Sequence, residues 1–288
     1  MNNKETNGTK IIVLGGLGEV GKNMYCVMHK DAIVIIDAGV SFPESELMGV
    51  DYVLPDFTFL KENEDKIKAL LITHGHEDHI GSIPFLLNQV NIPAIYAPNH
   101  AKELIAVKLQ DRNIRYDNLF VYTEDTKLKF KEIEVEFFRV THSIPDSHGI
   151  SIKTPDGRIC TTGDYKFDLT PIGPMANLYK MATLGEEGVD LLIGDSTNAL
   201  NEGFSNSESV VDETLGEMFD KCNSLQFIKL SCFDTSLVTD MSEIFCRCNS
   251  LESINLSNFN TSLVTDMSYM FYYCSSLESI DLSNFNTS

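Results

Sequence analysis

A cluster of metal-binding residue types occupies six consecutive positions of the 288-residue chain. His74, His76 and His79 supply imidazoles, and Glu77 and Asp78 supply carboxylates between them. Only seven histidines occur in the whole chain, so a polar surface loop that gathers three of them by chance is a poor explanation. Zinc above all is held in proteins by such nitrogen and oxygen donors. The cluster therefore predicts a metal site.

The elements around the cluster must bring its side chains together and add further donors. An apolar run at 70–72 predicts a buried strand that ends at the cluster, where the chain turns. A predicted strand at 132–140 leads to His142, which we expect to join His74 and His76 as the third imidazole around one metal ion. Two further strands, expected at 158–162 and 189–193 and both buried, also end close to acids. Surface or structural roles are expected for His100 and His148.

A glycine-rich loop follows the first predicted strand, at 11–14. Residues 16–21 match the G-x-G-x-x-G pattern of dinucleotide-binding proteins. Such a site requires a helix of about ten or more residues between the loop and the next strand. Here residues 24–28 already read as a strand, and the apolar run 32–36 follows it closely. The pattern favours a β-hairpin over a dinucleotide site.

Composition narrows the class of protein further. No apolar run reaches the length of about 20 residues that spans a membrane, and the polar residues 1–10 do not resemble a signal peptide. The seven cysteines are odd in number and unevenly placed, which favours a reducing compartment, so we expect a cytoplasmic protein without membrane contact. The net charge of −20 disfavours unaided binding of RNA phosphates, although bound metal ions would offset this locally.

Several separated motifs, taken together and in this order, resemble the ribonuclease J family. That family is the branch of the metallo-β-lactamase superfamily in which a β-CASP domain is inserted into the catalytic domain. The resemblance extends over about residues 10–219 and implies an α/β fold, namely the αββα sandwich of the metallo-β-lactamase type. The motifs are residues 15–23, 36–39, 74–79, 141–147, 162–165 and 194–198.

The resemblance also implies a role for each candidate residue. Asp78 and Asp164 would be catalytic, and Asp164 would bridge two zinc ions. Asp37 and Asp195 would support the ligands from outside without touching the metal, as acids behind metal-binding histidines commonly do. For Asp37, the alternative is an acid that caps a turn. The metal ligands that the resemblance implies are His74, His76, Asp78, His79, His142 and Asp164.

The activity that the resemblance implies is hydrolysis of RNA phosphodiester bonds by a metal-bound hydroxide. Two alternatives remain open. One is another metallo-hydrolase that acts on a lactone, a thioester or a lactam, and residues 143–147 and 194–197 favour the ribonuclease over it. The other is a non-catalytic protein that binds a protein partner through its C-terminal repeats.

The first of these repeats begins at Cys222, and the pattern begins again at Cys248 and at Cys274. Residues 235–242, for example, recur as 261–268 with an identical sequence. A fixed period of this length predicts a solenoid, and the pattern resembles BspA-like leucine-rich repeats. Each unit is expected to hold a helix, such as 266–273, and a strand, such as 277–282. The strands are expected to pair in parallel, and the repeat cysteines are expected to be buried rather than to bind zinc.

The expected domains are 1–206, a metallo-β-lactamase domain, then 207–222, a junction helix shared with the repeats, and 223–288, the repeats. No histidine follows His148, so the resemblance implies that a last metal ligand and the β-CASP domain are missing. We therefore expect a chimeric chain with one tight zinc site, an incomplete second site and impaired activity. The open edge of the repeats could also support an oligomer.

Overall fold

The computed structural model describes residues 8–43, 49–203, 205, 207, 208, 224, 226–228, 230, 235, 238–257 and 259–286. The chain divides into two compact units. The first consists of Met1–Phe167 and Met175–Phe204, and the second of Asp168–Pro174 and Ser205–Ser288. No helix among the described residues is both long and apolar enough to cross a membrane.

The first unit contains a six-stranded sheet with the order β1-β2-β3-β4-β5-β6. Its first three strands pair antiparallel, and β3 to β6 run parallel. The glycine-rich loop joins β1 to β2 in an antiparallel hairpin, so the predicted hairpin is confirmed. The strands are β1 (Lys10–Gly15), β2 (Met24–His29), β3 (Ala32–Ile36), β4 (Ile67–Leu71), β5 (Ile95–Ala97) and β6 (Leu119–Val121).

A five-stranded sheet with the order β11-β10-β9-β8-β7 packs on the first. Its strands pair antiparallel except for β10 and β11, which are parallel. The strand predicted at 189–193 was expected to be buried, and this is wrong. Leu192 of β11 is 63% exposed and Leu191 is 40% exposed, and β11 is an edge strand in the described part of the sheet. The strands are β7 (Lys127–Phe130), β8 (Ile133–Arg139), β9 (His148–Thr154), β10 (Gly157–Thr161) and β11 (Leu191–Ile193).

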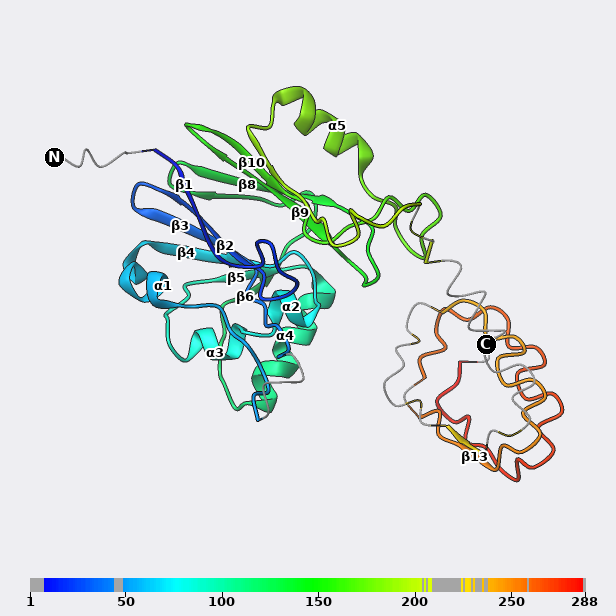
Figure 1. Ribbon diagram of the computed structural model, residues 1–288. Helices are drawn as coiled ribbons and strands as arrows, with labels where there is room; N and C mark the ends of the chain where they lie inside the picture. The colour runs from blue at the N-terminus through cyan, green and yellow to red at the C-terminus, as the bar shows by residue number, and fades with distance from the viewer. Residues whose placement is uncertain are drawn as a thin grey trace. The chain divides into compact units, whose positions relative to one another are not determined.

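Alternation of side chains along the strands builds two apolar layers. In β3, Ile33 and Ile35 face the helices, whereas Val34 and Ile36 face the second sheet, and all four are buried. Figure 1 shows α1, α3 and α4 on one side of the two sheets and α5 on the other, so the predicted αββα order of layers is present. The helices are α1 (Thr58–Glu62), η1 (Glu64–Lys66), α2 (Glu77–Ile80), α3 (Ile83–Leu87), α4 (Asn99–Asp111) and α5 (Leu178–Glu187).

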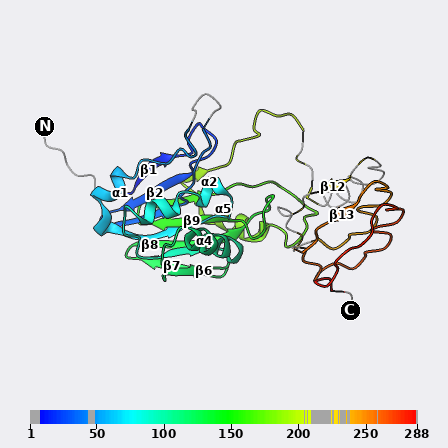
Figure 2. The same ribbon diagram turned by 90° about the horizontal axis from the view of Figure 1, so that it is seen from below.

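The second unit has its own apolar core, which includes Phe245, Cys248 and Leu251. Two short strands, β12 (Phe227–Ile228) and β13 (Ser253–Ile254), come from successive repeats and pair in parallel (Figure 2). The described cysteines of the repeats are buried, as predicted. The predicted junction helix, 207–222, lies almost wholly outside the described residues.

The helix predicted at 266–273 is wrong, because these residues form turns. Tyr269 and Tyr273 have left-handed backbone, with φ of 56° and 61°, and this interrupts a right-handed helix. The strand expected at 277–282 is likewise absent from the described residues. Backbone N–H groups of one repeat donate to carbonyls of the next repeat, for example Phe245 to Met270 at 3.1 Å, instead of bonding within a helix.

Tyr122 ties the layers together near the predicted site, and it generates a test. Its ring stacks on Phe137 at 3.6 Å, and its hydroxyl donates to the carbonyl of Ile72 at 2.6 Å. We predict that Tyr122→Phe lowers the free energy of unfolding by about 1–3 kcal/mol, because it leaves a buried carbonyl without its donor. Chemical denaturation measures this. The control Tyr179→Phe, at a side chain that is 84% exposed, should change it by less than about 0.5 kcal/mol. Equal effects of the two variants would contradict the prediction.

Candidate metal centre

Three strands of the first unit deliver the predicted ligands to one edge of the sandwich. The chain leaves β4 at Thr73 and passes through His74 and His76 into the short helix α2. After β8, an isolated bridge between Thr141 and Lys166 positions His142. After β10, the chain turns sharply towards Asp164 through a glycine with a φ of 57°. The candidate ligands therefore lie on the connections that follow strands, as expected.

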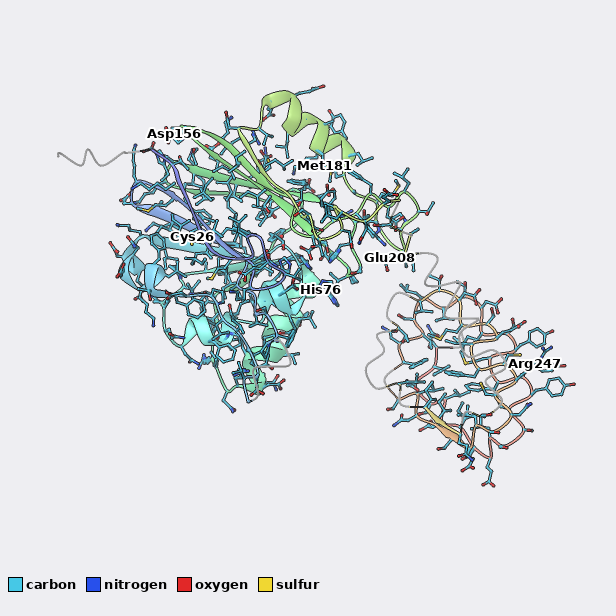
Figure 3. The ribbon with its side chains drawn as sticks, in the orientation of Figure 1. Cys26, His76, Asp156, Met181, Glu208 and Arg247 are labelled. Atoms are coloured by element: carbon cyan, nitrogen blue, oxygen red, sulfur yellow. The ribbon has the colours of Figure 1, made fainter. Side chains whose placement is uncertain are left out.

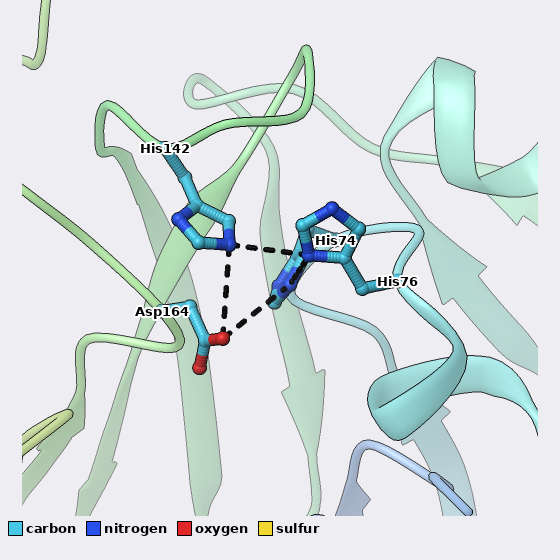
Figure 4. Close-up of side chains that lie close together, drawn as sticks. All are labelled: His74, His76, His142 and Asp164. Atoms are coloured by element: carbon cyan, nitrogen blue, oxygen red, sulfur yellow. Dashed lines mark hydrogen bonds and ion pairs between the residues drawn. The ribbon is translucent and has the colours of Figure 1, made fainter. Parts of the chain in front are cut away.

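The first ligand set consists of His74, His76, His142 and Asp164, whose donor atoms lie within 4.8 Å of one another. Nδ1 of His76 is 3.2 Å from Nε2 of His74 and 3.2 Å from Nε2 of His142 (Figure 4). Oδ2 of Asp164 is 3.7 Å from Nε2 of His142 and 4.0 Å from Nε2 of His74. A tetrahedral zinc ion with Zn–N bonds of about 2.0–2.1 Å holds its nitrogens about 3.3 Å apart. The observed spacing fits such an ion.

The second ligand set consists of Asp78, His79 and Asp164. Nε2 of His79 lies 3.3 Å from Oδ1 of Asp164 and 3.5 Å from Oδ2 of Asp78. The two carboxylate oxygens of Asp164 thus face different sets, Oδ2 the first and Oδ1 the second. A carboxylate in this position can bridge two cations. The second set borders a cavity of about 390 Å³, which is also lined by the glycine-rich loop and by residues 193–197.

Asp37 lies behind both sets and fixes His79. Its Oδ2 is 2.8 Å from Nδ1 of His79, and because a carboxylate only accepts, Nδ1 must donate its proton there. With Nδ1 committed to Asp37, Nε2 of His79, which faces Asp78 and Asp164, is the nitrogen that would supply a lone pair to a metal ion. Asp37 also accepts from the backbone N–H and the hydroxyl of Thr73, at 2.8 and 2.9 Å. Its carboxylate takes part in neither ligand set.

The ionisation of the site suits cation binding. Burial is the main cause that lowers the pKa values of His74, His76 and His142, so these imidazoles stay neutral and keep their lone pairs available. Burial would raise the pKa of Asp164, but the hydrogen bond from His79 and its positive charge lower it overall. Burial likewise opposes protonation of His79, yet the surrounding carboxylates raise its pKa well above the ordinary value. Such a reversal marks an excess of negative charge at the second set.

A backbone ladder holds the ligand loop against the segment that follows β3. Asn23 N–H donates to the carbonyl of Asp78 at 3.0 Å, and Ala38 N–H donates to that of His79 at 2.8 Å. The side-chain amide of Asn23 also lies 3.1 Å from Nε2 of His79. Sequence reasoning missed the roles of Asn23 and Thr73. Asn23 ends the glycine-rich motif at 15–23, so its position in that motif was the available signal.

The remaining candidates lie outside the two ligand sets. Asp195 lines the same cavity, where its carboxylate accepts from the N–H of Thr197 at 2.8 Å and its own N–H donates to Thr162. His148 is buried against the ring of Tyr122, and its Nδ1 donates to a carbonyl 2.9 Å away. His100 is half-buried at the start of α4.

Comparison with known proteins agrees with this fold. Residues 17–186 match the metallo-beta-lactamase superfamily. The chain belongs to the metallo-β-lactamase superfamily. Residues 213–288 match a family described as Mycoplasma protein of unknown function, DUF285.

Individual relatives narrow the resemblance. The chain is 52% identical over 210 residues to ribonuclease J 1 of Streptococcus pyogenes and 42% identical over 211 residues to ribonuclease J of Mycoplasma pneumoniae. Each alignment covers 73% of this chain but 37% of the relative, so the chain spans less than half the length of these proteins. A crystal structure of a protein of unknown function from Enterococcus faecalis V583 has a TM-score of 0.56 and 14% identity, over 96% of this chain and 78% of that one. It supports the fold alone.

The close approach of Gly39 to the ligand loop allows a test. A Cβ atom at Gly39 would lie 1.6 Å from the carbonyl oxygen of Asp78, so a side chain there must push the loop away. We predict that Gly39→Ala destabilises the fold by about 1–3 kcal/mol and weakens zinc binding. The control is Gly185→Ala in α5, where a Cβ meets no heavy atom within 4 Å. It should be neutral or stabilise by up to about 1 kcal/mol. Denaturation and zinc titration of both variants measure the difference, and unaltered zinc affinity in Gly39→Ala would contradict the prediction.

Proposed function

We propose that this chain is a zinc-dependent hydrolase of RNA phosphodiester bonds, of the ribonuclease J type. The observation that carries the proposal is the pair of ligand sets that share Asp164. The similarity to two proteins named ribonuclease J supports RNA as the substrate class. The other metallo-hydrolase activities, on lactones, thioesters or lactams, have no comparable support.

The residues present fit zinc in type and spacing. Three neutral imidazoles and a carboxylate form a common zinc donor set, and the nitrogen spacing of 3.2 Å suits tetrahedral geometry. Zinc, when bound, supplies Lewis acidity at a phosphoryl oxygen and lowers the pKa of a coordinated water. His74, His76 and His142 would hold one ion, and Asp164 would contribute to both sites.

The cavity beside the second set has the charge expected of a site that requires cations. Five acids line it, and none of its described lining residues is Lys or Arg. A phosphodiester would therefore be repelled unless metal ions occupied the ligand sets. Asp78, which borders the cavity, would accept hydrogen bonds from the attacking water and orient it. Asp37 would keep His79 in the tautomer that serves the second site, and we assign Asp195 the role of shaping the cavity wall. The acids that line the cavity are Glu19, Asp37, Asp78, Asp164 and Asp195.

We further propose that the repeats form a short solenoid of turn-and-strand units, similar to BspA-like leucine-rich repeats, and that the chain is chimeric. Every second backbone N–H group in 241–247 donates to a carbonyl at the equivalent turn of the next repeat, in 266–272. These bonds support a stack of repeats. The repeats are the basis for the second candidate function, binding of a protein partner. The two cysteines of the first unit, Cys26 and Cys160, are free and buried, which supports a reducing, cytoplasmic compartment.

The two ligand sets should differ in zinc affinity. Among the described residues, the first offers four donors and the second three, and Asp164 belongs to both. We predict that about one zinc ion per chain survives dialysis against a mild chelator. Elemental analysis of the purified protein measures the count. Two ions per chain after the same dialysis would contradict the weak second site.

Loss of a first-set ligand should abolish hydrolysis. Removal of a group that merely supports a metal ligand costs about 10–100-fold in affinity or activity, so removal of a ligand should cost more. We predict that His142→Ala lowers zinc affinity and the hydrolysis of single-stranded RNA at least about 100-fold. His100→Ala is the matched control, because His100 lies outside both ligand sets, and it should retain both properties.

The controls also separate the candidate functions. Zinc binding without zinc-dependent RNA hydrolysis, together with hydrolysis of a lactone or thioester substrate, would replace the ribonuclease by the other hydrolase. No hydrolysis of any of these substrates by zinc-loaded protein would favour the interaction protein.

A further inference from the structure

Four exposed side chains of the repeats form a patch that the core of the unit does not explain. Glu243 and Arg247 belong to one repeat, and Tyr269 and Tyr273 occupy the equivalent positions of the next repeat. The N–H of Glu243 donates to the carbonyl of Ser268 at 3.0 Å, as one of the bonds that join 241–247 to 266–272. This series of bonds places each residue beside its counterpart in the next repeat. We name Glu243, Arg247, Tyr269 and Tyr273 the lateral patch.

The backbone of the lateral patch is unusual. All four residues have left-handed backbone, with φ values of 57°, 60°, 56° and 61° in chain order. Glycine and asparagine adopt this conformation most readily, whereas residues with larger side chains pay for it in free energy. The repeats place large residues at these positions all the same. Strained residues of this kind often mark functional sites.

The four side chains stay exposed although the two tyrosine rings contact a neighbour. Tyr272 lies edge-on to Tyr269 and to Tyr273, at centroid distances of 5.5 and 4.4 Å. Tyr269 and Tyr273 are nevertheless each 62% exposed, and Glu243 and Arg247 are exposed as well. Figure 3 shows Arg247 at the margin of the repeat unit, among side chains that point outwards. Glu243 and Arg247 remain exposed even though the repeat that contains the two tyrosines stacks on the repeat that contains them. Their exposure is therefore a property of the lateral surface and not of a stacking face.

Charge identifies the kind of partner. Residues 238–286 contain six acids and one base, Arg247. RNA is disfavoured, because its affinity depends on Lys and Arg that neutralise phosphates. Exposed tyrosine faces attract Lys and Arg side chains, and carboxylates pair with them. Tyrosine and arginine are also the residue types that dominate protein–protein hot spots.

From these observations we propose that the lateral patch binds a protein partner through an Arg- or Lys-rich segment. Two cationic side chains of the segment would lie over Tyr269 and Tyr273, and Glu243 would pair with one of them. Arg247 would fix the orientation by meeting an acid or a carbonyl of the partner. The proposal is independent of the metal centre and of RNA hydrolysis.

The experiment uses the full chain and a fluorescently labelled peptide that alternates Arg and Gly. The test variant is the double substitution Tyr269→Asn and Tyr273→Asn. It removes both rings without changing the net charge, and asparagine tolerates left-handed backbone, so the fold is retained. Anisotropy titration should show binding to the unmodified protein that the double variant weakens about 5- to 30-fold, as two exposed cation–π contacts imply. The control, Tyr179→Asn at an exposed tyrosine of the first unit, should leave the affinity unchanged.

Three results would overturn the proposal. The peptide could fail to bind the unmodified protein. It could bind the double variant as tightly as the unmodified protein, which would reveal attraction to the overall charge alone. A labelled oligouridylate could bind the patch, with loss in the double variant, in place of the peptide. Thermal unfolding of the double variant checks the fold, and a midpoint at or above that of the unmodified protein is expected.

Discussion

The carboxylate of Asp37 is the interaction on which the metal centre depends. Asp37 follows β3, and its N–H donates to the carbonyl of Leu71 at the end of β4, so it lies where two parallel strands leave the sheet. The buried side chain accepts three hydrogen bonds, two from Thr73 and one from His79. A buried carboxylate without such donors is costly, so the three bonds and the path of the ligand loop stabilise each other. One acid thereby sets both the end of β4 and the tautomer of His79.

This arrangement explains why the site can be both rigid and electrostatically unfavourable. The second set concentrates carboxylates around one imidazole, and the pKa of His79 is raised accordingly. The backbone ladder from Asn23 and Ala38 holds the loop in place against that repulsion. Cations that bind the two sets would relieve it, and their binding free energy would add to the stability of the first unit. Apolar packing and the ladder thus position the ligands before a metal arrives, as a preformed site requires.

The sequence predicted those features that depend on local pattern. Apolar runs located β2, β3, β4 and β8, and the spacing after Gly21 distinguished a hairpin from a dinucleotide-binding unit. Residue type and position after predicted strands identified the residues that the structure brings into the two ligand sets. The roles of Asn23 and Thr73 were missed, because their hydrogen bonds join segments far apart in the chain. The exposure of β11 was missed for a similar reason, since an apolar run does not reveal whether another layer covers its side chains.

The repeats show most clearly where a local pattern misleads. Paired apolar residues, such as Ile244 with Phe245 and Met270 with Phe271, resemble one face of a helix. Turns place them in the core of the second unit instead, because N–H groups that would bond within a helix donate to the next repeat. Left-handed residues make those turns, and they direct their side chains outwards. The left-handed backbone that prevents a helix from forming therefore also creates the lateral patch. Its acidic surroundings and the acidic cavity of the first unit would have opposite consequences. The cavity would require metal cations before it could accept the proposed anionic substrate, whereas the partner proposed for the patch is itself cationic.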